Sequence, residues 1–228
     1  MNNTQSKMNP PLRCVSGISW PRSGHHLLVR LLSSYFGERF KYCEFYTEHL
    51  DCCRQFPCTR SESVNFTKNH DFKLDVEVRE TLLYIVQYRS FFNSVVSDFE
   101  LYVKVHGGSF DNRVEFNKFT LDRCKQYKKF TKKWIERKNA KNMLCVSYEE
   151  LIADTVGTTK ACIQLFSPQE EVDLEKLNEV IRTVDGEKVE QQKIIKNKNV
   201  GVHRSRDHKM FRFYDEEWQE MIDSVLAS

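Results

Sequence analysis

The fold is decided by residues 13–36, RCVSGISWPRSGHHLLVRLLSSYF, near the start of the sequence. Arg13–Ile18 has the short apolar composition of a buried strand. In Ser19–Gly24 a proline and a glycine favour a tight turn. Along His25–Phe36 the apolar residues recur at the spacing of one helical face. The stretch therefore predicts a strand, a loop and a helix in succession.

The same alternation continues along the chain. Further strands are predicted at Val64–His70, Thr81–Tyr88 and Asn142–Ser147. Further helices are predicted at Phe91–Val105, Leu121–Lys138, Tyr148–Ala153, Thr158–Leu165, Leu174–Val184 and Asp215–Leu226. Strands that alternate with helices predict an α/β fold, with a parallel sheet flanked by helices. We expect one domain over residues 13–228, preceded by a flexible tail at residues 1–12.

Composition excludes few function classes. The 228 residues are 40% hydrophobic, and the net charge is only +3, so any anion site must come from the local placement of Arg and Lys. No apolar run approaches the roughly 20 residues that span a bilayer. Met1–Pro11 is polar, which argues against a secretory signal and favours a cytoplasmic location.

The loop Ser19–Gly24 is the first candidate site. A helix that begins after a tight turn presents unpaired backbone N–H groups, and these bind phosphate. Arg22 adds a positive charge and Ser23 a hydroxyl. The Gly-x4-Gly-Lys-Ser/Thr pattern is absent, so this is not a Walker A loop. The alternative is an ordinary strand-to-helix turn with a surface arginine.

The motif Pro-Arg-Ser-Gly after a first strand resembles the 5′-phosphosulfate loop of the sulfotransferase superfamily. The resemblance implies that Arg22, Ser23, Gly24, His25 and His26 hold the 5′-phosphate of 3′-phosphoadenosine 5′-phosphosulfate (PAPS). The family usually has a pair of hydroxyl residues where this chain has its two histidines. Backbone donors survive that change, and an imidazole N–H can replace a lost hydroxyl.

Lys68-Asn69-His70 resembles the Lys-x-His element of the cytosolic branch of the family. The resemblance implies that His70 is the general base, while Lys68 and Arg22 neutralise charge at the transferring sulfonate. Alternate residues on a strand face the same side, so Lys68 and His70 can share one site. Histidine with an ordinary pKa of about 6.5 is a suitable base at neutral pH. The alternative is a plain surface strand end.

Three further segments match the family in part. Tyr88-Arg89 with Ser97 resembles the 3′-phosphate element, which implies that Arg89 and Ser97 bind that phosphate; a strand-end arginine and a helix serine are the alternative. Tyr148 begins a Tyr-Glu-Glu-Leu segment that resembles the element near the adenine. The late basic segment Gly201–Phe211 resembles the loop that closes on the 3′-phosphate, through Arg204 or Arg206.

The resemblance implies a PAPS-dependent sulfotransferase that needs no metal. It would leave 3′-phosphoadenosine 5′-phosphate (PAP) and transfer the sulfonate to a hydroxyl or amine of a small-molecule or carbohydrate acceptor. Tyr42–Arg60 and His106–Phe119 are the expected acceptor lining. One alternative is a catalytically altered nucleotide-binding protein of the same fold. The other is a small-molecule kinase, but the loop of this chain lacks the Walker lysine that a kinase needs.

A nucleic-acid binder is disfavoured. The basic segment Arg123–Lys141 also carries aromatic residues, but its aromatics fall on one helical face, which predicts that they are buried and that the basic residues face solvent.

Four cysteines lie close together in the sequence, at Cys43, Cys52, Cys53 and Cys58, with His49 among them. A zinc site and a disulfide are both open interpretations, but the tight Cys-x2-Cys spacing of zinc sites is absent. Nothing in the sequence indicates an oxidising compartment. Reduced thiols are therefore the favoured interpretation.

Overall fold

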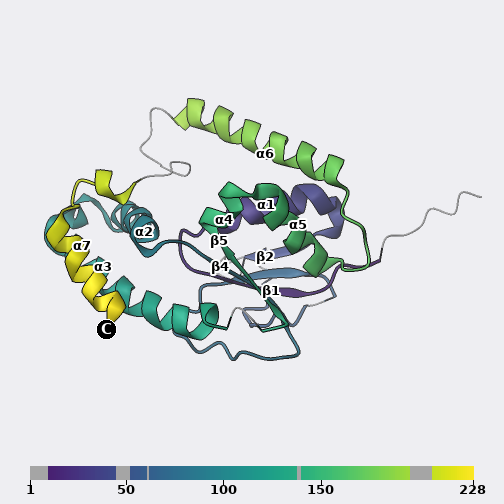
Figure 1. Ribbon diagram of the computed structural model, residues 1–228, viewed down its shortest axis with the longest axis horizontal. Helices are drawn as coiled ribbons and strands as arrows, with labels where there is room; N and C mark the ends of the chain where they lie inside the picture. The colour runs from purple at the N-terminus through teal and green to yellow at the C-terminus, as the bar shows by residue number, and fades with distance from the viewer. Residues whose placement is uncertain (1–9, 45–51, 61, 138–139, 196–206) are drawn as a thin grey trace, which may run out of the picture.

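The computed structural model describes residues 10–44, 52–60, 62–137, 140–195 and 207–228 (Figure 1). Within them lies one sheet of five strands in the order β2-β3-β1-β4-β5, and every neighbouring pair is parallel. The strands are β1 (Val15–Ser19), β2 (Tyr42–Glu44), β3 (Phe66–Asn69), β4 (Leu83–Tyr88) and β5 (Met143–Ser147). The predicted α/β fold with a parallel sheet is therefore confirmed.

Helices connect the strands. They are α1 (His25–Phe36), α2 (Phe91–His106), α3 (Arg113–Phe130), α4 (Tyr148–Ala153), α5 (Thr155–Phe166), α6 (Leu174–Ile195) and α7 (Glu216–Ala227). A π-helical turn, η3 (Thr131–Ile135), extends α3. Short 3₁₀ turns lie at η1 (Gly37–Arg39), η2 (Gly108–Phe110) and η4 (His208–Met210).

Several predicted boundaries were wrong. Helix α3 begins at Arg113 rather than Leu121, because the Asn112 side chain accepts a hydrogen bond from the Glu115 N–H and caps the helix there. Strand β2 was not predicted, since three residues carry too little pattern to identify a strand. Helix α6 continues well past Val184.

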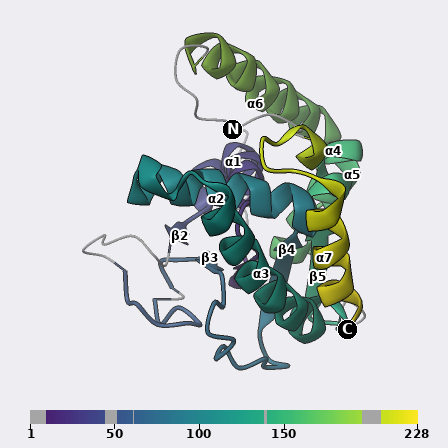
Figure 2. The same cartoon turned by 90° about the vertical axis from the view of Figure 1, so that its left-hand side faces the viewer.

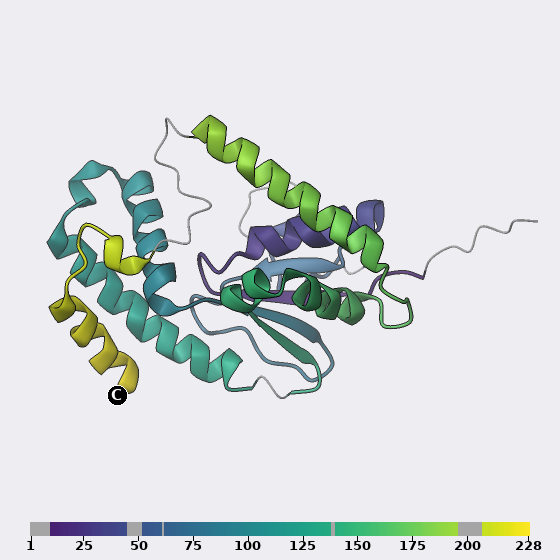
Figure 3. The ribbon, with the colours of Figure 1, turned by 45° about the horizontal axis from the view of Figure 1, so that its top comes forward.

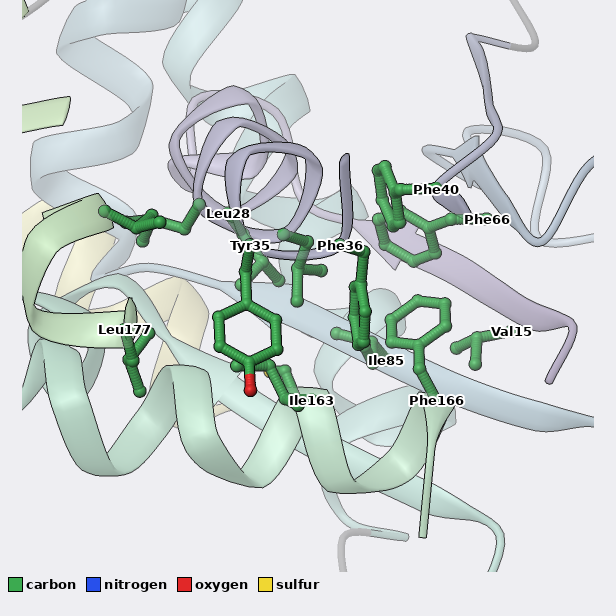
Figure 4. Packing of buried hydrophobic residues seen from close by; sticks show 14 of the residues in the cluster. Val15, Leu28, Tyr35, Phe36, Phe40, Phe66, Ile85, Ile163, Phe166 and Leu177 are labelled. Carbon is green, nitrogen blue, oxygen red and sulfur yellow. The ribbon is translucent and has the colours of Figure 1, made fainter. Parts of the chain in front are cut away.

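Two hydrophobic clusters cover the two faces of the sheet. Strand β4 shows the division, because Ile85 points into one cluster while Tyr84 and Val86 point into the other. The first cluster joins the sheet to α1, α5 and α6, and Figure 4 shows its aromatic and aliphatic side chains interlocked. Burying each such side chain contributes about 1.5–3 kcal/mol.

The second cluster joins the other face to α2, α3 and α7. Helix α7 lies along α3 (Figure 2), where Trp218 Nε1 donates to Thr120 Oγ1 over 3.0 Å. Phe130 and Trp134 are buried here, which confirms that the aromatic face of the basic segment is core. On the opposite side of the sheet, α6 runs across α1 (Figure 3).

No helix in the described ranges is both long enough and apolar enough to cross a bilayer. Because the strands are parallel, their carboxyl ends share one edge of the sheet, where ligands of α/β proteins bind. The segments that leave this edge carry nearly all of the predicted site residues.

Candidate functional site

The β1–α1 loop has a backbone conformation that residues with side chains rarely adopt. Arg22 has φ 62° and Gly24 has φ 81°, both in the left-handed region. A Cβ at Gly24 would lie 2.5 Å from Tyr148 Cδ2, so the ring packs directly against the loop backbone. No side chain caps α1, and the first N–H groups of the helix are therefore available to an anion.

Two buried polar atoms beside this loop have no partner within the described residues, namely Ser23 Oγ and Arg89 Nε. Ser23 is 1% exposed and Arg89 is 9% exposed. The Arg89 guanidinium stacks on the Tyr148 ring, 4.4 Å from its centroid, and burial lowers the pKa of Arg89. An unmatched buried donor costs about 1–3 kcal/mol, so this arrangement suits a bound anion.

A hydrogen bond joins the loop to α2. Arg22 Nε donates to Ser97 Oγ over 2.9 Å. The predicted sulfonate-binding cation therefore touches the serine predicted to bind the 3′-phosphate, two elements that are distant in the sequence. Together Arg22, Ser23, Arg89, Ser97 and Tyr148 form what we call the nucleotide half of the site.

On the other side of β1, Lys68 forms an ion pair that the sequence did not reveal. It is buried, and its Nζ lies 2.7 Å from Glu44 Oε1, across the register of β2 and β3. Partial burial by itself raises the pKa of Glu44, but the hydrogen bond and charge of Lys68 lower it overall. The exposed His26 lies 3.6 Å from the same carboxylate oxygen.

His70 is held in one orientation by β1. Its Nδ1 lies 2.5 Å from the Ser19 carbonyl oxygen, which can only accept, so Nδ1 carries the proton. The neutral ring therefore has its lone pair on Nε2. The ring also packs on the half-exposed Phe72, with centroids 5.1 Å apart. Glu44, Lys68 and His70 form the transfer half of the site.

Burial lowers the pKa of His70 to about 4, with the Ser19 hydrogen bond opposing this and the charges of Lys68 and Arg123 adding to it. The ordinary histidine pKa assumed from the sequence is therefore wrong for this site. The imidazole is uncharged throughout the neutral range, which is the state required of a proton acceptor.

The imidazole of His25 is turned into the protein. Its Nδ1 donates to Gln87 Oε1 over 2.8 Å, and its Nε2 accepts from the Tyr42 hydroxyl over 3.1 Å. Burial, followed by the charge of Lys68, lowers the pKa of His25 well below the usual range. Both ring nitrogens are already bonded within the protein, so the contact expected between this imidazole and the phosphate would have to come from the His25 backbone N–H instead.

Asp71 shows why the chain turns at this point. It has φ 47°, and its carboxylate accepts from Lys133 Nζ over 2.7 Å and from Trp134 Nε1 over 2.8 Å. This buried contact anchors the chain immediately after His70. Asp71 therefore fixes the segment that carries the candidate base.

Some predicted residues cannot be placed. Arg204 and Arg206 lie outside the described residues, as do residues 1–9 of the predicted tail. All eight cysteines are thiols. In the described part of the chain, no group of three or more His, Cys, Asp or Glu side chains could hold a metal ion.

Sequence comparison gives no relatives, because no family model and no curated protein matches. Comparison of the structure with solved structures does find similar proteins. The mouse sulfotransferase SULT7A1, complexed with PAP, superimposes with a TM-score of 0.63 at 16% identity, over 93% of this chain and 82% of that one. Retinol dehydratase, in complex with androsterone and the inactive cofactor PAP, superimposes with a TM-score of 0.63 at 14% identity, over 95% and 81%.

These likenesses extend over more than nine-tenths of this chain and agree with an α/β fold built on a five-stranded parallel sheet. They also agree with the resemblance recognised in the sequence. The chain has the fold of the sulfotransferases.

Proposed function

We propose that the protein is a PAPS-dependent sulfotransferase acting on a hydroxyl or amine of a small-molecule or carbohydrate acceptor. The observation that carries the proposal is the pair of unpartnered buried donors, Ser23 Oγ and Arg89 Nε, at two of the predicted phosphate positions. The neighbouring structures, one named a sulfotransferase and both with PAP bound, support the same chemistry.

The nucleotide half would hold the two ends of the nucleotide. The backbone N–H groups from Ser23 to His26 and the Ser23 hydroxyl would bind the 5′-phosphate. Arg89 and Ser97 would bind the 3′-phosphate, with Arg204 or Arg206 completing that contact. The Arg22–Ser97 hydrogen bond would then place a cation between the two phosphate positions. Tyr148, which already stacks on Arg89, would lie near the adenine.

The transfer half would move the proton and stabilise the transferring group. His70 Nε2 would take the proton of the acceptor hydroxyl while the acceptor oxygen bonds to sulfur. The bond from sulfur to the bridging phosphate oxygen would break in the same displacement. Lys68, together with Arg22 from the nucleotide half, would neutralise the negative charge that collects on the sulfonate and the leaving oxygen. No metal is required, since fixed cations supply the charge.

The acceptor would sit beside His70. The half-exposed Phe72, whose ring contacts His70 and also lies under the Arg123 guanidinium, offers an apolar surface beside the base. Glu44 lies at the end of β2, where it pairs with Lys68. Tyr42–Glu44 belongs to the expected acceptor lining and includes Glu44 of the transfer half, which supports an acceptor position beside His70. An apolar acceptor ring packed on Phe72 would bring its hydroxyl to His70.

Calorimetry tests the proposal directly. PAP is expected to bind about ten- to a hundred-fold more tightly than AMP, because a charged contact with the 3′-phosphate contributes about 1.5–3 kcal/mol. An acceptor screen with PAPS, in excess chelator, should then detect transfer. Equal affinity for PAP and AMP would overturn the assignment of the nucleotide half. Strict magnesium dependence with ATP as donor would favour a kinase instead.

A further inference from the structure

The cysteines around β2 form two close pairs that the proposed transfer reaction does not use. Cys43 Sγ lies 3.6 Å from Cys52 Sγ, and Cys53 Sγ lies 3.5 Å from Cys58 Sγ. Each of these four side chains is partly exposed to solvent. By contrast, Cys124 and Cys162 are buried in the two hydrophobic clusters.

Both pairs are in van der Waals contact but are not bonded. A disulfide needs the sulfur atoms about 2.05 Å apart, so each pair must close by about 1.5 Å. Backbone N–H groups also face two of the sulfurs, from Arg54 to Cys52 and from Arg60 to Cys58, each over 3.4 Å. The pairing seen here, 43 with 52 and 53 with 58, is one of the three that four cysteines allow.

We propose that Cys43, Cys52, Cys53 and Cys58 form a thiol–disulfide site, which oxidised glutathione converts into the disulfides Cys43–Cys52 and Cys53–Cys58. Cys53 reacts first. Its thiolate attacks one sulfur of oxidised glutathione and forms a mixed disulfide, while one glutathione thiolate leaves. Cys58 then attacks Cys53 Sγ and expels the second glutathione. The two protein thiols lose two hydrogens, and one oxidised glutathione becomes two reduced molecules.

The order follows from the surroundings of the sulfurs. Burial raises the pKa of Cys53, but hydrogen bonds with the backbone of Gln55 and Thr59 outweigh it and bring the pKa to about 7. Burial, with the neighbouring Cys52, raises the pKa of Cys43 to about 12. Only the thiolate attacks a disulfide, so the Cys53–Cys58 pair is expected to close before the Cys43–Cys52 pair at neutral pH.

Cys43 links this chemistry to the candidate site. It sits on β2 between Tyr42, which donates to His25, and Glu44, which holds Lys68. The second disulfide therefore forms one residue from the transfer half. The disulfides themselves do not depend on the proposed function, because they are detected without any assay of transfer.

Peptide mapping of the folded full chain tests the proposal. The protein is treated with oxidised glutathione near neutral pH, blocked with N-ethylmaleimide and digested with trypsin without reduction. Cleavage after Lys41, Arg54 and Arg60 leaves Cys43, Cys52 and Cys53 in one peptide and Cys58 in the next. We expect these peptides cross-linked through Cys53–Cys58 first, and a Cys43–Cys52 bond inside the longer peptide later.

Serine variants identify the partners. Cys53→Ser should abolish the Cys53–Cys58 cross-link but keep the Cys43–Cys52 bond. Cys43→Ser should abolish the Cys43–Cys52 bond but keep the cross-link. Cys14→Ser, outside the cluster, should give the wild-type pattern. Three results would overturn the proposal. The cross-link to Cys58 could run through Cys52 or Cys43, the mixed disulfides with glutathione could persist without forming protein disulfides, or the disulfides could form only after unfolding. Fragmentation of the wild-type peptides decides the pairing even if a variant fails to fold.

Discussion

The two halves of the candidate site differ in how their polar groups are satisfied. In the nucleotide half, Ser23 Oγ and Arg89 Nε are buried and lack partners among the described residues. In the transfer half, Lys68 is paired with Glu44, and His70 donates to the Ser19 carbonyl. The nucleotide half thus has two buried donors without partners, besides its internal Arg22–Ser97 hydrogen bond, whereas Lys68 and His70 of the transfer half are both bonded within the protein.

This difference separates binding from chemistry. Unmatched buried donors cost free energy until an anion arrives, so they favour tight binding of a ligand with phosphates. Groups that internal partners hold in one orientation need little reorganisation when the reaction occurs. Changes in the nucleotide half should therefore alter affinity, and changes in the transfer half should alter rate.

The largest expected effect is that of His70→Ala. Loss of the general base should reduce the transfer rate by about 10²–10⁴-fold while PAP affinity stays near that of the wild type. Single-turnover kinetics and calorimetry measure the two quantities. His26→Ala serves as the parallel variant, because its exposed ring lies near Glu44 but is not placed as the base. Near-normal turnover of His70→Ala, with a dead His26→Ala that still binds PAP, would assign the base to the loop.

Arg89→Ala should act on the other half alone. Without the guanidinium, the preference for PAP over AMP should fall by about ten- to a hundred-fold, since a charged contact of about 1.5–3 kcal/mol is lost. AMP affinity, measured on the same sample, is the control. If AMP affinity falls as much as PAP affinity, the conclusion would be that Arg89 stabilises the fold through Tyr148 and does not bind the 3′-phosphate.

Gly24→Ala tests whether the loop conformation serves the nucleotide half. The added Cβ would collide with Tyr148, and overpacking of this kind costs about 1–3 kcal/mol of unfolding free energy, in addition to strain at φ 81°. Denaturant unfolding and PAP titration should both show the loss. Gly37→Ala is the matched control, because it also has a positive φ but nothing within 4 Å. It should keep PAP affinity; equal weakening by both variants would contradict the prediction.

The smallest expected effect is a pKa change at His70 on ligand binding. In the free protein its pKa is about 4. Bound phosphates favour the charged imidazolium, so PAP should raise the pKa by about one to two pH units. NMR titration of the His70 ring, assigned with His70→Ala, measures it. Below the free pKa the protonated ring cannot act as a base, so kcat/KM should fall there; a fall near pH 6.5 would contradict the burial argument.

The sequence predicted the fold well, because it rests on local patterns. The apolar run Leu82–Val86 and the helical spacing of His25–Phe36 each required only neighbouring residues, and α1 begins and ends where predicted. The parallel order followed from the alternation of strands and helices. The order of four short motifs also led to the sulfotransferase resemblance, which the structural neighbours support at the level of the fold.

Tertiary structure decided what each polar group touches. Glu44 could not be identified from the sequence, because its partner Lys68 is on another strand and β2 is only three residues long. His25 and His26 are adjacent in the sequence, yet one is buried against Gln87 and the other is exposed. The pKa of His70 likewise depends on burial and on Ser19. Local sequence sets the periodicity of the backbone, whereas burial and partners arise only when distant segments meet at one edge of the sheet.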